Sequence, residues 1–215
     1  MQKSKELQQR IFYGIIIAVV AIYTIYIGGL AFNFLAAAVM VVMFFEFRGL
    51  LKHKPDTNKL FWYFLMVLYI LIPIICFVIL RSSVNGFDVA IWLVLVIAAS
   101  DIGGLAIGKL FGKHKLAPKI SPNKTWEGLL GCCIFAGIVS YCYTMLPSFI
   151  IIGALIAIIS QAGDLTESLI KRYFGVKDTS GLIPGHGGLM DRLDGYLYAA
   201  PLTLLWHYSG VLAFV

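Results

Sequence analysis

Charged residues are scarce in this sequence. Only 13% of its 215 residues are Asp, Glu, Lys or Arg, whereas 60% are hydrophobic. A soluble domain carries about 25% charged residues and about 45–50% apolar ones. An apolar excess of this size needs a bilayer as its solvent. The composition therefore excludes an ordinary soluble domain and predicts an all-α, polytopic integral membrane protein.

Cysteine is also rare, and the pattern of the basic residues excludes nucleic acid as a partner. The cysteines form no CxxC pair, so we expect packing residues rather than a zinc site: Cys76, Cys132, Cys133 and Cys142. The net charge is +6, but the Lys and Arg lie in short clusters between apolar runs, where membrane orientation explains them. The apolar run after Arg10 is too long for a cleavable signal peptide.

Long apolar runs are what the sequence does have, and they predict about seven transmembrane helices. A span needs roughly 20 apolar residues. Residues 11–45 carry no charge and are too long for one span, so we place a turn at Gly28-Gly29. The other helices are expected at about 60–80, 87–108, 126–146, 148–171 and from 190 to the C-terminus. Residues 1–90 are interpreted as N-terminal transmembrane helices, and residues 91–215 as a catalytic transmembrane region.

The basic residues predict the orientation of these helices. With the N-terminus in the cytoplasm, 16 of the 17 Lys and Arg residues fall in cytoplasmic segments, and only Arg81 lies outside. An excess of Lys and Arg marks cytoplasmic loops. We therefore expect a multi-pass protein of the cell inner (cytoplasmic) membrane, with its C-terminus outside.

Acidic residues gather near the predicted cytoplasmic helix ends, where charge beside hydrocarbon is usually functional. They are Asp101, Asp164, Glu167, Asp191 and Asp194. Helical spacing places Asp164 on one face with Ser168, and Asp191 on one face with Asp194. Carboxylates held close together repel unless a cation neutralises them, and Mg²⁺ binds such oxygens together with substrate phosphates. The alternative is that these acids pair with neighbouring Lys and Arg, and for Glu167 the two readings are equally weighted.

Two segments are candidates for phosphate binding. The glycine-rich segment 181–188 precedes the last helix, where backbone N–H groups and a helix N-terminus can bind an anion, and Lys171, Arg172, Lys177 and Arg192 surround it. The segment 121–128 carries Ser121, Lys124 and Thr125, which either contact phosphate or belong to a basic loop that caps a helix. His186 is an acid, base or metal ligand, or it only fixes its loop.

The segment 168–194 resembles the defining motif of phosphatidate cytidylyltransferases, also called CDP-diacylglycerol synthases. It carries S-x-x-K-R, then K-D, then P-G-H-G-G-x-x-D-R-x-D, and Asp101 with the segment 121–128 resembles the upstream motif. The resemblance implies transfer of CMP from CTP to phosphatidate, with Mg²⁺ bound by Asp164 and Asp191. The lipid phosphate is already an anionic nucleophile, so catalysis needs positioning and charge neutralisation rather than a strong base.

The expected site combines these residues on the cytoplasmic face. The catalytic group is Asp164, Lys171, Arg172, Asp191, Arg192 and Asp194. The substrate-binding group is Ser121, Lys124, Thr125, Ser168, Lys177, His186, Gly187 and Gly188. The expected partners are CTP, phosphatidate and the lipid bilayer, with a homodimer left open.

Two other functions compete with cytidylyl transfer. A CTP-dependent polyprenol or phytol kinase would transfer a terminal phosphate to a lipid alcohol and would need a base for the hydroxyl. A transporter would place its ionisable groups across the depth of the bilayer, whereas here they crowd at one face. The sequence therefore favours the cytidylyltransferase, with the kinase as its alternative.

Overall fold

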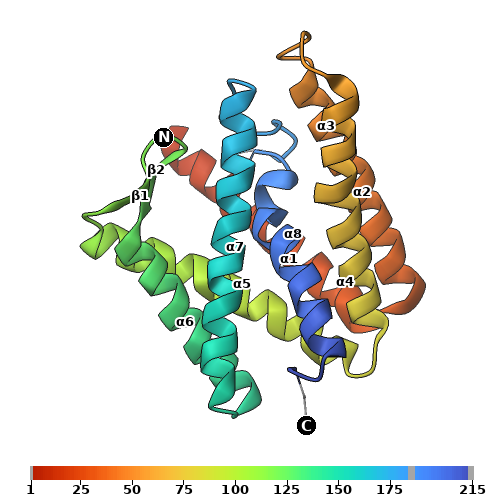
Figure 1. The fold of residues 1–215 in the computed structure, drawn as a ribbon, viewed down its shortest axis with the longest axis vertical. Helices are drawn as coiled ribbons and strands as arrows, with labels where there is room; N and C mark the ends of the chain where they lie inside the picture. Colours follow the sequence, from red (N-terminus) through yellow and green to blue (C-terminus); the bar gives the residue numbers. More distant parts are fainter. Residues whose placement is uncertain (1, 184–186, 213–215) are drawn as a thin grey trace.

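The computed structural model describes residues 2–183 and 187–212, with side chains from residue 12 onward. This part of the chain is mainly helical (Figure 1). The helices are α1 (Gln2–Ile27), α2 (Gly29–Leu51), α3 (Lys59–Met66), α4 (Ile72–Ser82), α5 (Gly86–Phe111), α6 (Trp126–Thr144), α7 (Ser148–Tyr173) and α8 (Met190–Tyr208). A short π-helical segment, η1 (Val67–Leu71), joins α3 to α4, so 59–82 forms one helical rod.

Among the described residues, five helical rods are long and apolar enough to cross a membrane. They are Gly29–Leu51, Lys59–Ser82, Gly86–Phe111, Trp126–Thr144 and Ser148–Tyr173. The apolar part of α1 is shorter (Phe12–Ile27), and α8 begins with the charged residues Asp191, Arg192 and Asp194. Large apolar side chains such as Leu30 and Phe34 point outward at more than 70% exposure, as a lipid-facing surface requires.

The predicted turn between the first two helices is confirmed at Gly28. Its φ of 67° is a conformation that glycine adopts without a Cβ penalty. A Cβ there would also lie 2.5 Å from the Arg81 guanidinium. Arg81 donates hydrogen bonds to the carbonyls of Ile25 and Tyr26 at 2.6 and 3.2 Å. The single basic residue predicted outside therefore binds the free carbonyls at the end of α1.

The helices form two packed groups that meet at α7 and α8. Figure 1 shows α7 near the middle, with α6 and the hairpin on one side, α2 to α4 on the other, and α5 crossing behind α7. One buried cluster includes Trp92 of α5, Phe149 and Ile156 of α7 and Ala199 of α8. A second includes Met43 of α2, Trp62 of α3, Phe174 and Met190. The last helix thus contributes to the packing of both halves.

Glycines allow α5 and α6 to cross closely. A Cβ on Gly131 would lie 2.5 Å from the carbonyl oxygen of Gly103, and one on Gly104 would lie 2.5 Å from Cys132 Sγ. Small residues at such a crossing let two helix backbones approach, as in membrane helix pairs. The close contact continues to Gly108 and Gly112, which lie against Thr125 and Gly128 where the hairpin meets α6.

The segment after α5 departs from the all-α prediction because it contains a two-stranded antiparallel hairpin, β1 (Lys115–Ala117) and β2 (Ser121–Thr125). Glu127 closes it by accepting hydrogen bonds from the backbone N–H groups of Lys113 and His114 and by pairing with the His114 ring at 2.6 Å. The polar run 113–125 has no alternation of apolar residues, which is why the sequence suggested a loop.

Candidate active site

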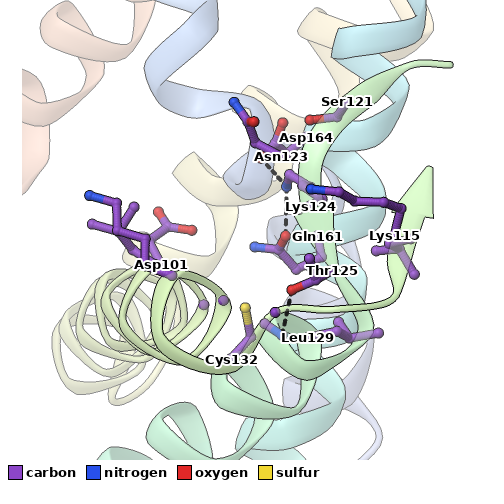
Figure 2. Close-up of a pocket in the computed structure, with 17 residues that line it drawn as sticks. Asp101, Lys115, Ser121, Asn123, Lys124, Thr125, Leu129, Cys132, Gln161 and Asp164 are labelled. Carbon is purple, nitrogen blue, oxygen red and sulfur yellow. Dashed lines mark hydrogen bonds and ion pairs between the residues drawn. The ribbon is translucent and has the colours of Figure 1, made fainter. Parts of the chain in front are cut away.

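A pocket of about 650 Å³ lies between the C-terminal half of α5, the N-terminal end of α6, the hairpin and α7 (Figure 2). Gly104, Gly108 and Gly112 form its floor on α5 without side chains. Its polar lining consists of Asp101, Lys109, Lys115, Ser121, Asn123, Lys124, Thr125, Gln161 and Asp164, and Leu105, Leu116, Leu129 and Cys132 also line it. The pocket therefore brings together four of the predicted site residues, Ser121, Lys124, Thr125 and Asp164, from segments about 40 residues apart.

Lys124 connects the hairpin to α7 across this pocket. Its ammonium group pairs with the Asp164 carboxylate and donates a hydrogen bond to Gln161 Oε1 at 2.6 Å. Figure 2 shows Lys124 reaching toward both side chains, with Asp101 on the opposite wall. The Asp164 side chain is 32% exposed, so its carboxylate remains accessible from the pocket. Gln161 was missed by sequence reasoning, although it precedes Asp164 by one helical turn and shares its face.

Thr125 caps α6 as the capping alternative predicted. Its hydroxyl accepts a hydrogen bond from Gly128 N at 3.0 Å, and the residue is buried. The cap fixes the first turn of α6, which carries positive partial charge from its free N–H groups. Gly128 and Leu129 of that turn line the pocket. A helix N-terminus and the lysines of the hairpin thus lie along the same cavity.

A second charged group lies where α7 meets the start of α8. Lys171 is buried and its Nζ contacts Glu167 Oε2 at 3.1 Å and Asp191 Oδ1 at 2.6 Å. Glu167 is fully buried, with its Oε1 atom lacking a partner among the described residues. Glu167 therefore follows the second interpretation of the acidic residues, in which an acid pairs with a neighbouring Lys or Arg. A buried carboxylate needs a partner of opposite charge, and Lys171 is that partner.

The Asp191 carboxylate also holds the segment before α8. Its Oδ2 atom accepts hydrogen bonds from Thr179 N at 2.9 Å, Thr179 Oγ1 at 2.8 Å and Gly188 N at 2.7 Å. Only 5% of the side chain is exposed. The Oδ1 atom accepts only the Lys171 hydrogen bond among those given for it, whereas Oδ2 accepts three.

A comparison with known protein families identifies the chain. The model of the cytidylyltransferase family matches residues 50–209, which include the pocket and the Asp191 segment.

The chain belongs to the cytidylyltransferase family.

Relatives of this cytidylyltransferase-family chain include proteins named phosphatidate cytidylyltransferase. The one from Mycobacterium tuberculosis is 44% identical over 122 residues, which cover 54% of the chain and 37% of that protein. The one from Haemophilus influenzae is 38% identical over 135 residues, covering 58% of the chain and 47% of that protein. The one from Brucella suis is 29% identical over 250 residues, 93% of each. The chain thus spans less than half the length of the first two relatives and nearly all of the third, and the predicted resemblance is confirmed.

The remaining predicted residues of the cytidylyltransferase-family site lie outside the pocket lining. Arg172 is exposed and donates hydrogen bonds to the carbonyls of Ile120 at 3.3 Å and Val176 at 2.9 Å. The Ser168 hydroxyl lies 3.4 Å from Asp164 Oδ1. Lys177 and Arg192 are exposed. His186 lies outside the described residues, and for Gly187 the structure gives a hydrogen bond from Ile183 N to its carbonyl oxygen at 2.9 Å.

The five acidic residues outnumber the cations around them. Asp101 and Asp194 lie within electrostatic range of Asp164, and Glu167 within range of Asp191 and Asp194. The cations associated with these five acids are Lys124, Lys171 and Arg192, which leaves a formal excess of two negative charges. Among the described residues, no group of three or more acidic, His or Cys side chains is placed to hold a metal ion by itself. Mg²⁺ commonly uses one or two carboxylates and completes its shell with water and phosphate.

Glu46 of α2 is a site residue that sequence reasoning missed. It is buried, and its carboxylate accepts hydrogen bonds from Ser180 Oγ at 2.6 Å, Leu189 N at 2.9 Å and Met190 N at 2.8 Å. The N-terminus of α8 therefore binds a carboxylate of the protein itself. The available signal was an isolated acid at the end of the uncharged stretch 11–45.

Proposed function

We propose that this chain transfers CMP from CTP to phosphatidate, giving CDP-diacylglycerol and pyrophosphate. The observation that carries the proposal is the pocket at the ends of α5 and α7, which combines lysines, a helix N-terminus and carboxylates. Membership of the cytidylyltransferase family supports it, as do relatives named phosphatidate cytidylyltransferase. CTP and phosphatidate are accordingly proposed as the substrates of the whole protein.

CTP is the substrate that suits the pocket. Its volume of about 650 Å³ lies within the range of small-molecule sites, about 300–1,000 Å³. Lys109 and Lys115 line it together with the first turn of α6, and these groups favour a triphosphate. The glycine floor on α5 lets a flat group approach the helix backbone. We therefore assign the nucleotide to this pocket, with Ser121, Lys124 and Thr125 beside its phosphates.

The reaction is a substitution at phosphorus. An oxygen of the lipid phosphate forms a bond to the α-phosphorus of CTP, and the bond to the bridging oxygen of the β-phosphate breaks. Pyrophosphate leaves with the electron pair of that bond. The nucleophile is already ionised, so Lys124, Lys171 and Arg192 serve by reducing repulsion between two anions and by holding them in line. No side chain has to remove a proton.

Mg²⁺ fits the acidic side of this arrangement. Asp164 would hold it from the pocket wall and Asp191 through Oδ1, the carboxylate oxygen that lies beside Lys171. The bound ion would neutralise phosphate charge and stabilise the leaving pyrophosphate. Lys124 balances the charge of Asp164 and Lys171 that of Asp191 without the ion.

The proposed arrangement in the membrane follows the charge pattern. We propose seven spans, made by α1, α2, the 59–82 rod, α5, α6, α7 and α8, with the N-terminus and the active site in the cytoplasm of the inner membrane. Five of these rods are long and apolar enough to span. The pocket lies at the helix ends that carry the hairpin lysines, where a soluble nucleotide and a membrane lipid can meet.

Position-specific labelling of CTP distinguishes the transferase from its alternative. Purified protein in detergent is incubated with Mg²⁺, phosphatidate and CTP labelled at the α- or the γ-phosphate. The proposal expects α-label in the lipid and γ-label in pyrophosphate. The CTP-dependent polyprenol or phytol kinase would instead place γ-label in lipid when given a lipid alcohol, and would leave α-label in CDP. Label in no lipid product would reject both functions.

A further inference from the structure

Glu46 connects the N-terminal helices to the start of α8. It lies on α2, outside the family-matched residues 50–209 and absent from the segments that carry the predicted motifs. The residue is 6% exposed. Both carboxylate oxygens are used, since Oε1 accepts from Ser180 Oγ and Leu189 N and Oε2 accepts from Met190 N. The bonds to Leu189 and Met190 join residues more than 140 positions apart in the sequence.

The contact supplies what the beginning of a helix lacks. The first N–H groups of a helix have no partner within it, and negative charge at that end is favourable. Here the backbone N–H groups of Leu189 and Met190 bind Glu46, while that of Gly188 binds Asp191. The two carboxylates therefore divide three successive amides between them and define where α8 begins.

We propose that Glu46 is a positioning residue for the cytidylyl transfer, which sets the start of α8 and thereby the place of Asp191. This inference rests on the proposed function. Asp191 lies one residue after Met190, and its Oδ1 atom meets Lys171 at 2.6 Å. A helix start that frayed by one turn would release Asp191 from both Lys171 and Thr179. Glu46 itself is not among the residues that line the nucleotide pocket.

Gly188 supports this assignment independently. A Cβ at this position would lie 2.6 Å from Glu46 Oε1 and would also collide with Thr179 Oγ1. Glycine is needed there because a Cβ would meet Thr179 Oγ1 first and the Glu46 carboxylate next, and not because of its backbone φ, which is not of the positive kind that favours glycine. Gly188, which belongs to the motif, therefore leaves the space that Glu46, which lies outside the motif, occupies.

The first experiment measures kcat and KM for CTP separately, so that an effect on positioning can be distinguished from a loss of general stability. Glu46→Ala removes the carboxylate, and Glu46→Gln retains one acceptor oxygen. Ser140→Ala is the matched control, because it removes a buried hydrogen bond, from Trp92 Nε1 at 2.9 Å, away from the start of α8. We expect Glu46→Ala to lower kcat at least ~10-fold with KM for CTP changed less than ~2-fold, and Glu46→Gln to recover part of the loss. Ser140→Ala should lower the melting temperature and leave kcat unchanged.

The second experiment measures the anchor without using activity. Hydrogen–deuterium exchange of the full chain in detergent reports the amides of residues 188–190. We expect at least ~10-fold faster exchange there in Glu46→Ala than in wild type or Ser140→Ala. If Glu46→Ala is too unstable to purify, Ser180→Ala, which removes one of the three donors, is expected to give a smaller change of the same kind.

The outcomes separate this inference from the proposed function. Unchanged exchange at residues 188–190 would overturn the anchor, whatever the wild type catalyses. Faster exchange with wild-type kcat would overturn the positioning role. A wild type that forms no CDP-lipid would reject the proposed function, and the positioning role with it, while the exchange data would still decide whether Glu46 anchors α8.

Discussion

Single carboxylates in this protein hold structure and carry charge at the same time. Asp191 binds Lys171 through one oxygen and the backbone of Thr179 and Gly188 through the other. The charged partner and the neutral donors lie on opposite sides of the carboxylate, so a substitution that spares its volume still changes both. Substitutions of single residues can therefore test metal binding and positioning separately.

Asp191→Asn should lower kcat/KM at least ~100-fold while the protein still folds. That factor corresponds to about 2.7 kcal/mol of transition-state stabilisation. The amide has one acceptor oxygen, so its NH₂ group must face either Lys171 or the three donors from Thr179 and Gly188. Kinetics across Mg²⁺ concentrations and a melting curve measure the two effects, with Asp56→Asn on an exposed loop as control. Near-normal activity at limiting Mg²⁺ would contradict a metal-binding Asp191.

Lys171→Ala, Arg172→Ala and Arg192→Ala should each lower kcat/KM at least ~10-fold, about 1.4 kcal/mol. The effect on stability should differ between them. Lys171 is buried between two acids, so its loss leaves buried charge unpaired, which typically costs about 3–5 kcal/mol. Arg172 is exposed on two carbonyls, and its loss should hardly change the melting temperature. Unchanged kinetics with a lower melting temperature would make each residue structural.

At the level of elements, the site depends on how closely α5 and α6 cross. The glycine pairs of this crossing leave no room for a Cβ, and the same helix ends carry the pocket and the hairpin. The face of α5 that carries Gly104 and Gly108 therefore serves two purposes, because it packs against α6 and forms the floor of the pocket. A change in the crossing should therefore alter nucleotide binding.

Gly131→Ala should destabilise the protein by about 1–3 kcal/mol and raise KM for CTP. The new methyl group would lie 2.5 Å from the Gly103 carbonyl oxygen, so the helices must separate. Gly49→Ala is the matched control, since a Cβ there meets nothing within 4 Å and alanine favours a helix. Melting temperatures and CTP kinetics of the two variants decide the point. Equal stability of Gly131→Ala and wild type would show that the crossing tolerates a wider spacing.

On the scale of the whole molecule, chemistry and charge gather at one end of an otherwise apolar helical body. The hairpin lysines and the pocket lie at the same end of α5 and α7. The loop that joins α4 to α5 lies at the other end and contains Val84, which is 81% exposed. The proposed cytidylyl transfer requires this arrangement, because CTP dissolves in water and phosphatidate in the bilayer.

Cysteine accessibility in intact cells should show residues 177 and 84 on opposite sides of the membrane. In a background with the native cysteines replaced by alanine, Val84→Cys should react with an impermeant maleimide from outside. Lys177→Cys should react only after the cells are opened, because the basic loops are expected in the cytoplasm. External labelling of residue 177 would reverse the topology and move the site to the wrong face for CTP.

Local spacing and composition were enough to predict much of this protein. The helices at 60–80, 87–108, 126–146 and 148–171 agree with the structure to within a few residues, because apolar length is a local property. The Gly28 turn and the family resemblance also came from neighbouring residues, whose types and intervals are visible in the chain itself. The hairpin was missed, since its strands are short, polar and held by Glu127 from the next helix.

Tertiary structure alone decided which charges meet. The sequence placed Asp164 near Ser168, but only packing brings Lys124 of the hairpin onto Asp164 and Lys171 onto Asp191. It likewise places Glu46 against the start of α8, across more than 140 residues of chain. Helical periodicity fixes neighbours three or four positions apart, whereas contacts between helices depend on crossing angles and on the buried volume between them. The sequence thus determined which groups the site contains, and the fold determined their partners.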